Sequence, residues 1–193
     1  MGKGRFEAFS DGVIAIILTI MVLELKVPHE AGLAALKPLL PVLLCYVLSF
    51  VNIGIYWNNH HHMLHTVDRV SGAMLWANLH LLFWLSLMPF ATGWMGENHF
   101  ASVPVALYGV VLLMCGVAYK LLTEAIIASQ GPQSLLKKAI GGDSKGWIPL
   151  GLYTTAIPAA FWFPQISLTF YVIVALLWLV PDTRIERVLD AKE

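Results

Sequence analysis

The sequence predicts an all-α integral membrane protein with six transmembrane helices per subunit. Of its 193 residues, 58% are hydrophobic and 12% are charged, and the mean hydropathy is +0.72, whereas a soluble domain carries about 25% charged residues. The apolar residues form long runs, and most basic residues lie between alternate runs. The net charge is zero and there is no basic block, so nucleic acid is not an expected partner.

Six apolar runs are candidates for membrane-spanning helices, because a span needs about 20 mostly apolar residues. They lie at approximately 6–25, 37–57, 70–95, 101–122, 147–163 and 166–181. A cytoplasmic loop at 123–146 and a charged tail at 182–193 complete a single transmembrane domain over residues 1–193. The first run contains acidic residues and has no clear cleavage site, so we interpret it as a retained helix rather than a signal peptide.

The basic residues favour a multi-pass protein of the cell inner membrane with both termini cytoplasmic. In that orientation Lys26 and Lys37 are outside and the other ten of the 12 basic residues are inside, as the positive-inside rule predicts. The ten are Lys3, Arg5, Arg69, Lys120, Lys137, Lys138, Lys145, Arg184, Arg187 and Lys192. The rule supports an even number of membrane crossings more strongly than it supports the exact count of six. The last two runs are short and carry three prolines, so they could instead form one broken hairpin: Pro149, Pro158 and Pro164.

Ser10 and Asp11 interrupt the first apolar run. Both residue types are good helix N-caps, and a carboxylate suits the positive end of a helix. A helix from Gly12 to Leu25 would rise only about 21 Å, however, and would not cross a core of about 30 Å. We therefore predict that the helix begins near Arg5 and contains Asp11, facing protein or a water-filled cavity. A structural network is favoured over direct ion binding.

The partner of Asp11 is expected on another helix. Arg5 is six positions away, whereas partners on one helix lie three or four apart. The end of the second run, at 57–62, and the start of the third, from Arg69, lie at the same membrane face. Asn78 reaches this layer if the third helix is tilted. Interhelical polar contacts of this kind contribute about 1 kcal/mol each.

The histidines in WNNHHHMLH, residues 57–65, form a second polar cluster. His61 and His65 are one turn apart, a spacing found in metal sites, but zinc usually takes three or four protein ligands and no Cys or carboxylate partner is obvious nearby. A structural or proton-sensitive cluster is favoured, and no metal site is predicted. Cys45 and Cys115 lie in apolar runs and are interpreted as core thiols.

One face of the first predicted helix is apolar with a single hydroxyl: Gly12, Ile16, Thr19, Ile20 and Leu23. Its simplest interpretation is a surface that faces lipid or core. Hydrophobic constrictions also gate pores, and composition alone does not distinguish the two.

The motif Arg5-x-x-x-Phe9-Ser10-Asp11-Gly12, in a helix that ends in LELKVP, closely resembles the transmembrane protein 175 family of potassium channels. Trp57-x-x-His60-His61 and Trp76-x-Asn78 resemble the marks of that family on its second and third helices. The similarity covers nearly the whole chain, which resembles the short prokaryotic members with six helices and one repeat per subunit.

The resemblance implies a homotetramer in a lipid membrane, in which the first helices line a central pore for passive potassium flow. It implies no selectivity loop of the TVGYG kind, which this sequence lacks, and no cofactor besides the permeant potassium. In the family, a large aliphatic residue five positions after the motif Asp forms the constriction, here Ile16. A Thr eight positions after it is implicated in selectivity, here Thr19, and further aliphatic layers fall on Ile20 and Leu23. The expected structural supports are Arg5, Phe9, Ser10, Asp11, His60, His61, Trp76 and Asn78.

Two other functions remain as alternatives. A secondary transporter would show an inverted repeat and paired broken helices, and only the Pro-rich region 147–164 hints at one. A metal-binding membrane protein would use the cluster His60, His61, His62 and His65. No nucleophile–base pair or phosphate loop suggests an enzyme.

Overall fold

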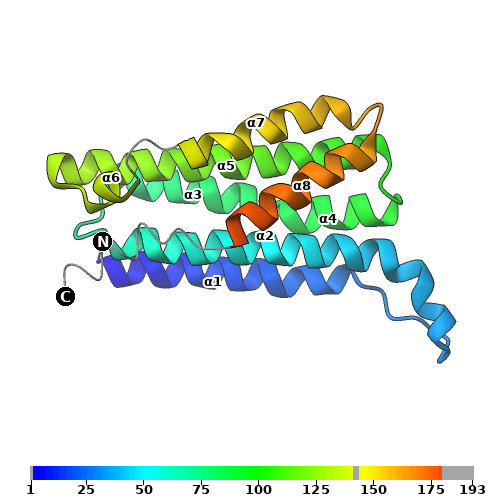
Figure 1. Ribbon diagram of the computed structural model, residues 1–193. Coiled ribbons are helices and arrows are strands. Elements are labelled where there is room, and N and C mark those ends of the chain that lie inside the picture. Colours follow the sequence, from blue (N-terminus) through cyan, green and yellow to red (C-terminus); the bar gives the residue numbers. More distant parts are fainter. Residues whose placement is uncertain (1, 141–143, 180–193) are drawn as a thin grey trace.

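The computed structural model describes residues 2–140 and 144–179, apart from the side chains of residues 133, 144 and 145. Over these residues the chain is helical and contains no strand (Figure 1), which confirms the all-α prediction for this part. The predicted charged tail at 182–193, with its basic residues, and the side chain of Lys145 lie outside the described residues.

Eight α-helices and three short 3₁₀ segments make up the described chain. They are α1 (Lys3–Met21), η1 (Val22–Glu24), η2 (Leu33–Leu39), α2 (Leu40–His65), α3 (Gly72–Ser86), α4 (Met88–Glu97), α5 (Ser102–Gln130), η3 (Gly131–Gln133), α6 (Leu135–Ile140), α7 (Ser144–Ala159) and α8 (Pro164–Leu179). Four stretches are long and apolar enough to cross a membrane: α1 with η1, η2 with α2, α3 with α4, and α5. The helices α7 and α8 have 16 described residues each, or about 24 Å.

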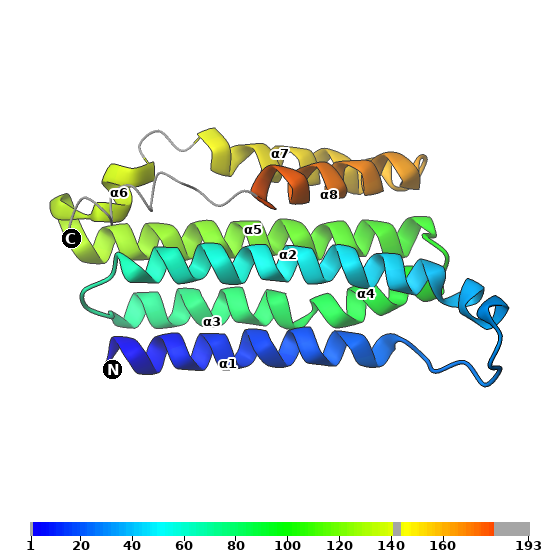
Figure 2. The same ribbon diagram turned by 60° about the horizontal axis from the view of Figure 1, so that its bottom comes forward.

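The long helices run antiparallel to their neighbours in the chain (Figure 1). Figure 2 shows α1 on one side of the bundle, then α2 with α3 and α4, then α5, and finally the hairpin of α7 and α8. The hairpin packs on α5, and α8 also contacts α2. Within the described residues, the helix α1 packs against α2, α3 and α4, which lie on one side of it (Figure 2).

The run predicted as one helix at 70–95 is divided into α3 and α4 at Leu87. Pro89 has no N–H group and cannot donate to the carbonyl of Leu85, so the regular bonding pattern stops there. The N–H of Leu87 instead bonds the carbonyl of Trp84 at 3.2 Å, and the N–H of Ala91 bonds that of Leu87 at 3.1 Å. The two helices follow each other as one stretch long enough to span.

The second and fourth runs extend beyond their predicted ends at 57 and 122, since α2 continues to His65 and α5 to Gln130. The prediction followed the apolar run, which ends where polar residues begin. Buried apolar side chains continue past that point, namely Met63 and Leu64 on α2 and Ile126 on α5. Burial of these side chains in the bundle extends both helices, because helical stability comes mainly from the packing of an amphipathic face.

The hairpin of α7 and α8 packs closely against α5 at Gly109. The Tyr171 hydroxyl donates to the carbonyl oxygen of Val105 at 3.1 Å, and Tyr171 is fully buried. A Cβ atom on Gly109 would lie 2.1 Å from the Tyr171 hydroxyl oxygen. Only glycine therefore lets α8 approach α5 this closely.

Gly109→Ala is expected to destabilise the protein by about 1–3 kcal/mol, because the added methyl group overpacks a buried contact. The measurement is the free energy of unfolding in detergent micelles. Gly151→Ala on α7 is the matched control, because no atom lies within 4 Å of its added Cβ, and a gain of helix propensity should leave it neutral or slightly more stable. Equal destabilisation by both variants would contradict the close contact.

Candidate functional site

The helix α1 has two distinct faces. One is buried against the bundle, with a spacing of three and four residues that is typical of a packed helix face: Phe6, Ser10, Ile14, Ile17 and Met21. The helix begins at Lys3, so Ser10 and Asp11 lie more than a turn inside it rather than at its cap. The same helical geometry that buries Ser10 turns Gly12 and Ile16 away from the bundle.

A buried chain of hydrogen bonds joins α1 to α2 and α3; we call Ser10, Asn78 and His60 the polar clasp. The Asn78 Nδ2 group donates to Ser10 Oγ at 2.9 Å, and Ser10 Oγ donates to the carbonyl oxygen of Phe6 at 3.0 Å. Asn78 Oδ1 lies 2.8 Å from His60 Nε2. Because the amide oxygen can only accept, His60 carries its proton on Nε2. All three clasp residues are at most 1% exposed.

A second, more exposed contact lies beside the clasp. Trp57 Nε1 on α2 donates to Asp11 Oδ1 on α1 at 3.0 Å, so the partner of Asp11 comes from the end of α2. The His61 ring stacks against Trp57 with centroids 6.1 Å apart, and His61 Nε2 lies 3.1 Å from His65 Nε2. Within the described residues, no three His, Cys, Asp or Glu side chains gather closely enough to hold a metal ion.

Three of the predicted supports lie outside these contacts. Arg5 is exposed and makes no hydrogen bond or ion pair with the described part of the chain. Phe9 is 49% exposed and Trp76 is 76% exposed. Trp57 was absent from the predicted set of supports, although its place at the end of the second run and its indole N–H, which usually finds a partner when it is partly buried, mark it as a donor.

The opposite face of α1 is an exposed apolar stripe. Ile16 is 58% exposed, Ile20 44% and Leu23 75%, and Gly12 and Thr19 are exposed between them. The Thr19 hydroxyl donates to the carbonyl oxygen of Ile16 at 2.9 Å, which satisfies its proton within the helix. In a membrane, such a stripe is covered either by lipid or by other protein surfaces.

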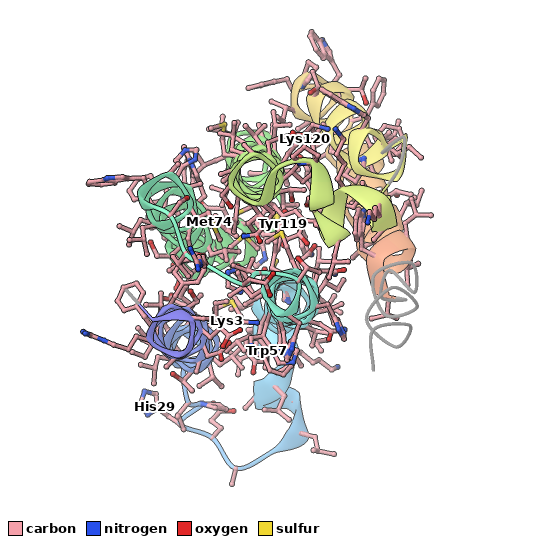
Figure 3. All side chains as sticks on the ribbon, turned by 90° about the vertical axis from the view of Figure 1, so that its left-hand side faces the viewer. Lys3, His29, Trp57, Met74, Tyr119 and Lys120 are labelled. Carbon is pink, nitrogen blue, oxygen red and sulfur yellow. The ribbon has the colours of Figure 1, made fainter. Side chains whose placement is uncertain are left out.

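Contacts between distant segments identify the two ends of the bundle. At one end, Lys3 Nζ donates to the carbonyl oxygen of His65 at 3.4 Å, and Figure 3, viewed from this end, shows Lys3 between α1 and α2. At the other end Lys26 forms an ion pair with Glu97. The hydrogen bond and the charge of Glu97 raise the pKa of Lys26, because both favour the charged ammonium group.

Known proteins are similar to this chain over a region that includes the motif at residues 5–12. A family model described as the endosomal/lysosomal potassium channel TMEM175 matches residues 5–89. A potassium channel of Chryseobacterium sp. strain P1-3 is 56% identical over 187 residues, which is 97% of each chain. This chain belongs to the TMEM175 family. The sequence-based prediction of this family is therefore confirmed, and a multi-pass membrane protein follows from membership and from the apolar helices.

The TMEM175 fold is known from a crystal structure of a protein from Chamaesiphon minutus that is described as a homologue of the lysosomal potassium-selective channel TMEM175. It has 29% sequence identity to this chain, a TM-score of 0.78, and a match covering 91% of this chain and 95% of the other. A vertebrate TMEM175, from Gallus gallus, is named an endosomal/lysosomal proton channel and is 35% identical over 103 residues. That match covers 47% of this chain and 21% of the vertebrate one.

Asp11→Asn is expected to leave folding and ion conduction nearly unchanged, because asparagine keeps the oxygen that accepts from Trp57. Asp11→Leu removes the acceptor and should cost about 0.5–1.5 kcal/mol, the typical contribution of one hydrogen bond. Unfolding in detergent and ion flux in vesicles are measured for both variants. If Asp11→Asn abolished flux while the protein stayed folded, the carboxylate charge would act on the ion and the structural role would be wrong.

Proposed function

We propose that four copies of this chain form a passive potassium channel whose pore is lined by α1. The observation that carries the proposal is the division of α1 into two faces: hydrogen bonds hold one face to the bundle, while the apolar stripe on the other is exposed among the residues that the structure describes. The names of the Chryseobacterium and Chamaesiphon relatives, a potassium channel and a homologue of a potassium-selective channel, support potassium as the permeant ion.

The stripe supplies a constriction without a filter loop. Four Ile16 side chains facing one axis narrow the pore, with further aliphatic layers at Ile20 and Leu23. A narrow apolar segment holds water poorly, so it blocks ions until it widens and fills with water. Thr19 places a ring of hydroxyl oxygens next to this segment, where partly dehydrated potassium ions would be selected. The clasp and the Asp11–Trp57 contact set the rotation of α1 that turns this stripe toward the axis.

The proposed orientation has both termini on the cytoplasmic side of the cell inner membrane. Lys3, His65 and Arg69 lie at the same end of the bundle: Lys3 bonds the carbonyl of His65, and Gln130 at the end of α5 bonds that of Arg69 at 3.3 Å. Lys26 lies at the other end, paired with Glu97. This agrees with the positive-inside rule. In this proposal α7 and α8 also cross the membrane, giving six crossings per subunit.

Protons are a second candidate permeant ion, because the vertebrate relative is named a proton channel. Reversal potentials distinguish the two ions: the potential of a potassium channel follows the potassium gradient and ignores a pH gradient. A proton channel gives the opposite dependence.

Single-channel recording of purified protein in planar lipid bilayers tests the proposal. Discrete openings whose reversal potential follows the potassium gradient are expected. Saturable flux coupled to a substrate, without discrete openings, would instead identify a secondary transporter and overturn the proposed pore. Crosslinking of the reconstituted protein should give tetramers.

A further inference from the structure

Each subunit contains a cavity that the proposed pore does not use. It lies among α2, α5, α7 and α8 with α6 at its edge, and no residue of α1 lines it. Its volume of about 90 Å³ exceeds the roughly 10–15 Å³ that one water needs by this measure. Its polar lining is concentrated on α2, α5 and α7: Asn52, Tyr56, Asn59, Lys120, Thr123 and Tyr153.

The cavity is lined by amide side chains whose oxygen atoms are open to it. The side-chain amide of Asn52 donates to the Leu48 carbonyl oxygen at 3.0 Å, and that of Asn59 donates to the Ile55 carbonyl oxygen at 2.8 Å. Both amide groups are thus anchored to their own helix through nitrogen. Their oxygens accept no hydrogen bond from the described residues, and since no fully buried side-chain oxygen there lacks a partner, both oxygens remain accessible to a small guest. Two accessible acceptors side by side in one cavity suit a guest that carries hydrogen-bond donors.

Basic residues line the same cavity and lie on the helix at its edge. Lys120 Nζ lies 3.8 Å from the centre of the Trp147 ring, and Figure 3 shows Lys120 on the side of α5 that faces α7. The exposed Lys137 and Lys138 lie on α6, whose Ile140 lines the cavity. The sequence from 120 to 146 carries four lysines and two acidic residues. Lysine and tryptophan together at the end of a membrane bundle are typical of the lipid headgroup layer.

An apolar groove continues from the cavity toward the outside of the bundle. It is lined mainly by Phe50, Val51, Gly54 and Leu179, with Asn58 as its one amide, and it shares Ile55 and Trp178 with the cavity. The groove runs between α2 and α8, which form part of the surface that faces lipid when the chain spans a membrane. Positive charge, hydrogen-bond acceptors and an apolar groove therefore lie beside one another in one connected site.

We propose that this cavity binds one anionic glycerophospholipid with a hydroxyl-bearing headgroup, such as phosphatidylglycerol. The phosphate lies against Lys120, with Lys137 and Lys138 adding positive charge. The headgroup hydroxyls and accompanying waters donate to the amide oxygens of Asn59 and Asn52. One acyl chain follows the groove between α2 and α8. Anionic lipids are concentrated in the cytoplasmic leaflet and bind basic pockets between helices on that side, which agrees with the proposed orientation.

The test is lipid titration of the purified, delipidated wild-type protein, followed by native mass spectrometry. About one phosphatidylglycerol should be retained per chain, with phosphatidylcholine binding more weakly. Lys120→Gln should weaken phosphatidylglycerol binding about fivefold, since one lysine near an anionic surface contributes about 1 kcal/mol. Lys37→Gln, at the other end of the bundle, is the matched control and should bind as wild type does. Equal binding of both lipids, or equal loss in both variants, would overturn the site.

A second variant separates the headgroup from the charge. Asn59→Leu should weaken phosphatidylglycerol binding but leave phosphatidic acid, which has no headgroup hydroxyls, unchanged; equal weakening of both would overturn the assigned role of Asn59. Binding of glycerol 3-phosphate, which is soluble and has no acyl chains, is measured in parallel. If it bound as tightly as the lipid does, the cavity would be a site for a free phosphate compound instead. None of these outcomes depends on conduction, so the lipid site and the proposed channel can fail independently.

Discussion

Replacing Ile16 with asparagine is expected to raise potassium conductance about tenfold, which corresponds to about 1.4 kcal/mol removed from the barrier. Ile16 is exposed on the stripe of α1 that we place around the pore. In a tetramer the substitution exchanges a ring of four branched apolar side chains for a ring of amides. Water then fills the constriction more readily, and ions cross it without losing as much hydration. Discrimination between potassium and sodium should fall as well, and both effects are read from single-channel currents under mixed gradients.

Two isoleucines provide matched controls for this result. Ile173 on α8 is 39% exposed and lies on a helix remote from α1 (Figure 2), so Ile173→Asn should leave conductance unchanged. Ile17, one position after Ile16, is 4% exposed, so Ile17→Asn should destabilise the subunit by placing an amide in its core. If Ile16→Asn altered stability but not current, the stripe would face lipid and the proposed pore would be wrong.

Replacing Asn78 with leucine is expected to destabilise the subunit by about 2–4 kcal/mol, because the buried His60 ring loses its partner and the Ser10 hydroxyl loses one of its two. Asn78 bonds Ser10 through its nitrogen and His60 through its oxygen, and leucine of similar size does neither. The Ser10 hydroxyl keeps its bond to the Phe6 carbonyl, whereas His60 Nε2 has no second acceptor among the described residues. The free energy of unfolding in detergent micelles measures the loss.

Asn98→Leu is the control for the clasp. Asn98 is exposed and donates only to the Trp94 carbonyl at 2.8 Å, so its loss should cost well under the amount expected for Asn78. A double-mutant cycle with Ser10→Ala then gives the coupling energy between Ser10 and Asn78. A coupling near zero would mean that the clasp does not hold α1 to α3.

The helices that cross the bundle are largely predictable from this sequence, and their ends are not. Apolar runs mark spans because lipid accepts only long stretches without charge. The polar residues after residue 57 end the run but not the helix, because Met63 and Leu64 remain buried. Burial is decided by neighbouring helices, which the run itself does not contain. The break at Leu87, by contrast, follows directly from Pro89.

The polar contacts are likewise only partly predictable from the sequence. Ser10 and Asp11 can be recognised in the sequence as candidates for interhelical contacts, because a hydroxyl and a carboxylate in a spanning helix need partners. Trp57 as the donor to Asp11 comes from the packing of α1 on α2. A further buried chain was not anticipated at all: Ser49 Oγ lies 2.7 Å from Thr92 Oγ1 and 3.0 Å from the Tyr108 hydroxyl. Its members are single polar residues on three helices, and no local spacing connects them.

By itself, the sequence determines that this chain is helical and membrane-embedded, and its motif at residues 5–12 determines its family. These properties depend on composition, on the length of apolar runs and on a few adjacent residues, all of which are local. Which face of α1 is held and which is exposed, and where a cavity with unpaired amide oxygens lies, are decided only by the tertiary structure. Both depend on the relative rotation of helices far apart in the chain, and that rotation is set by packing and hydrogen bonds between them.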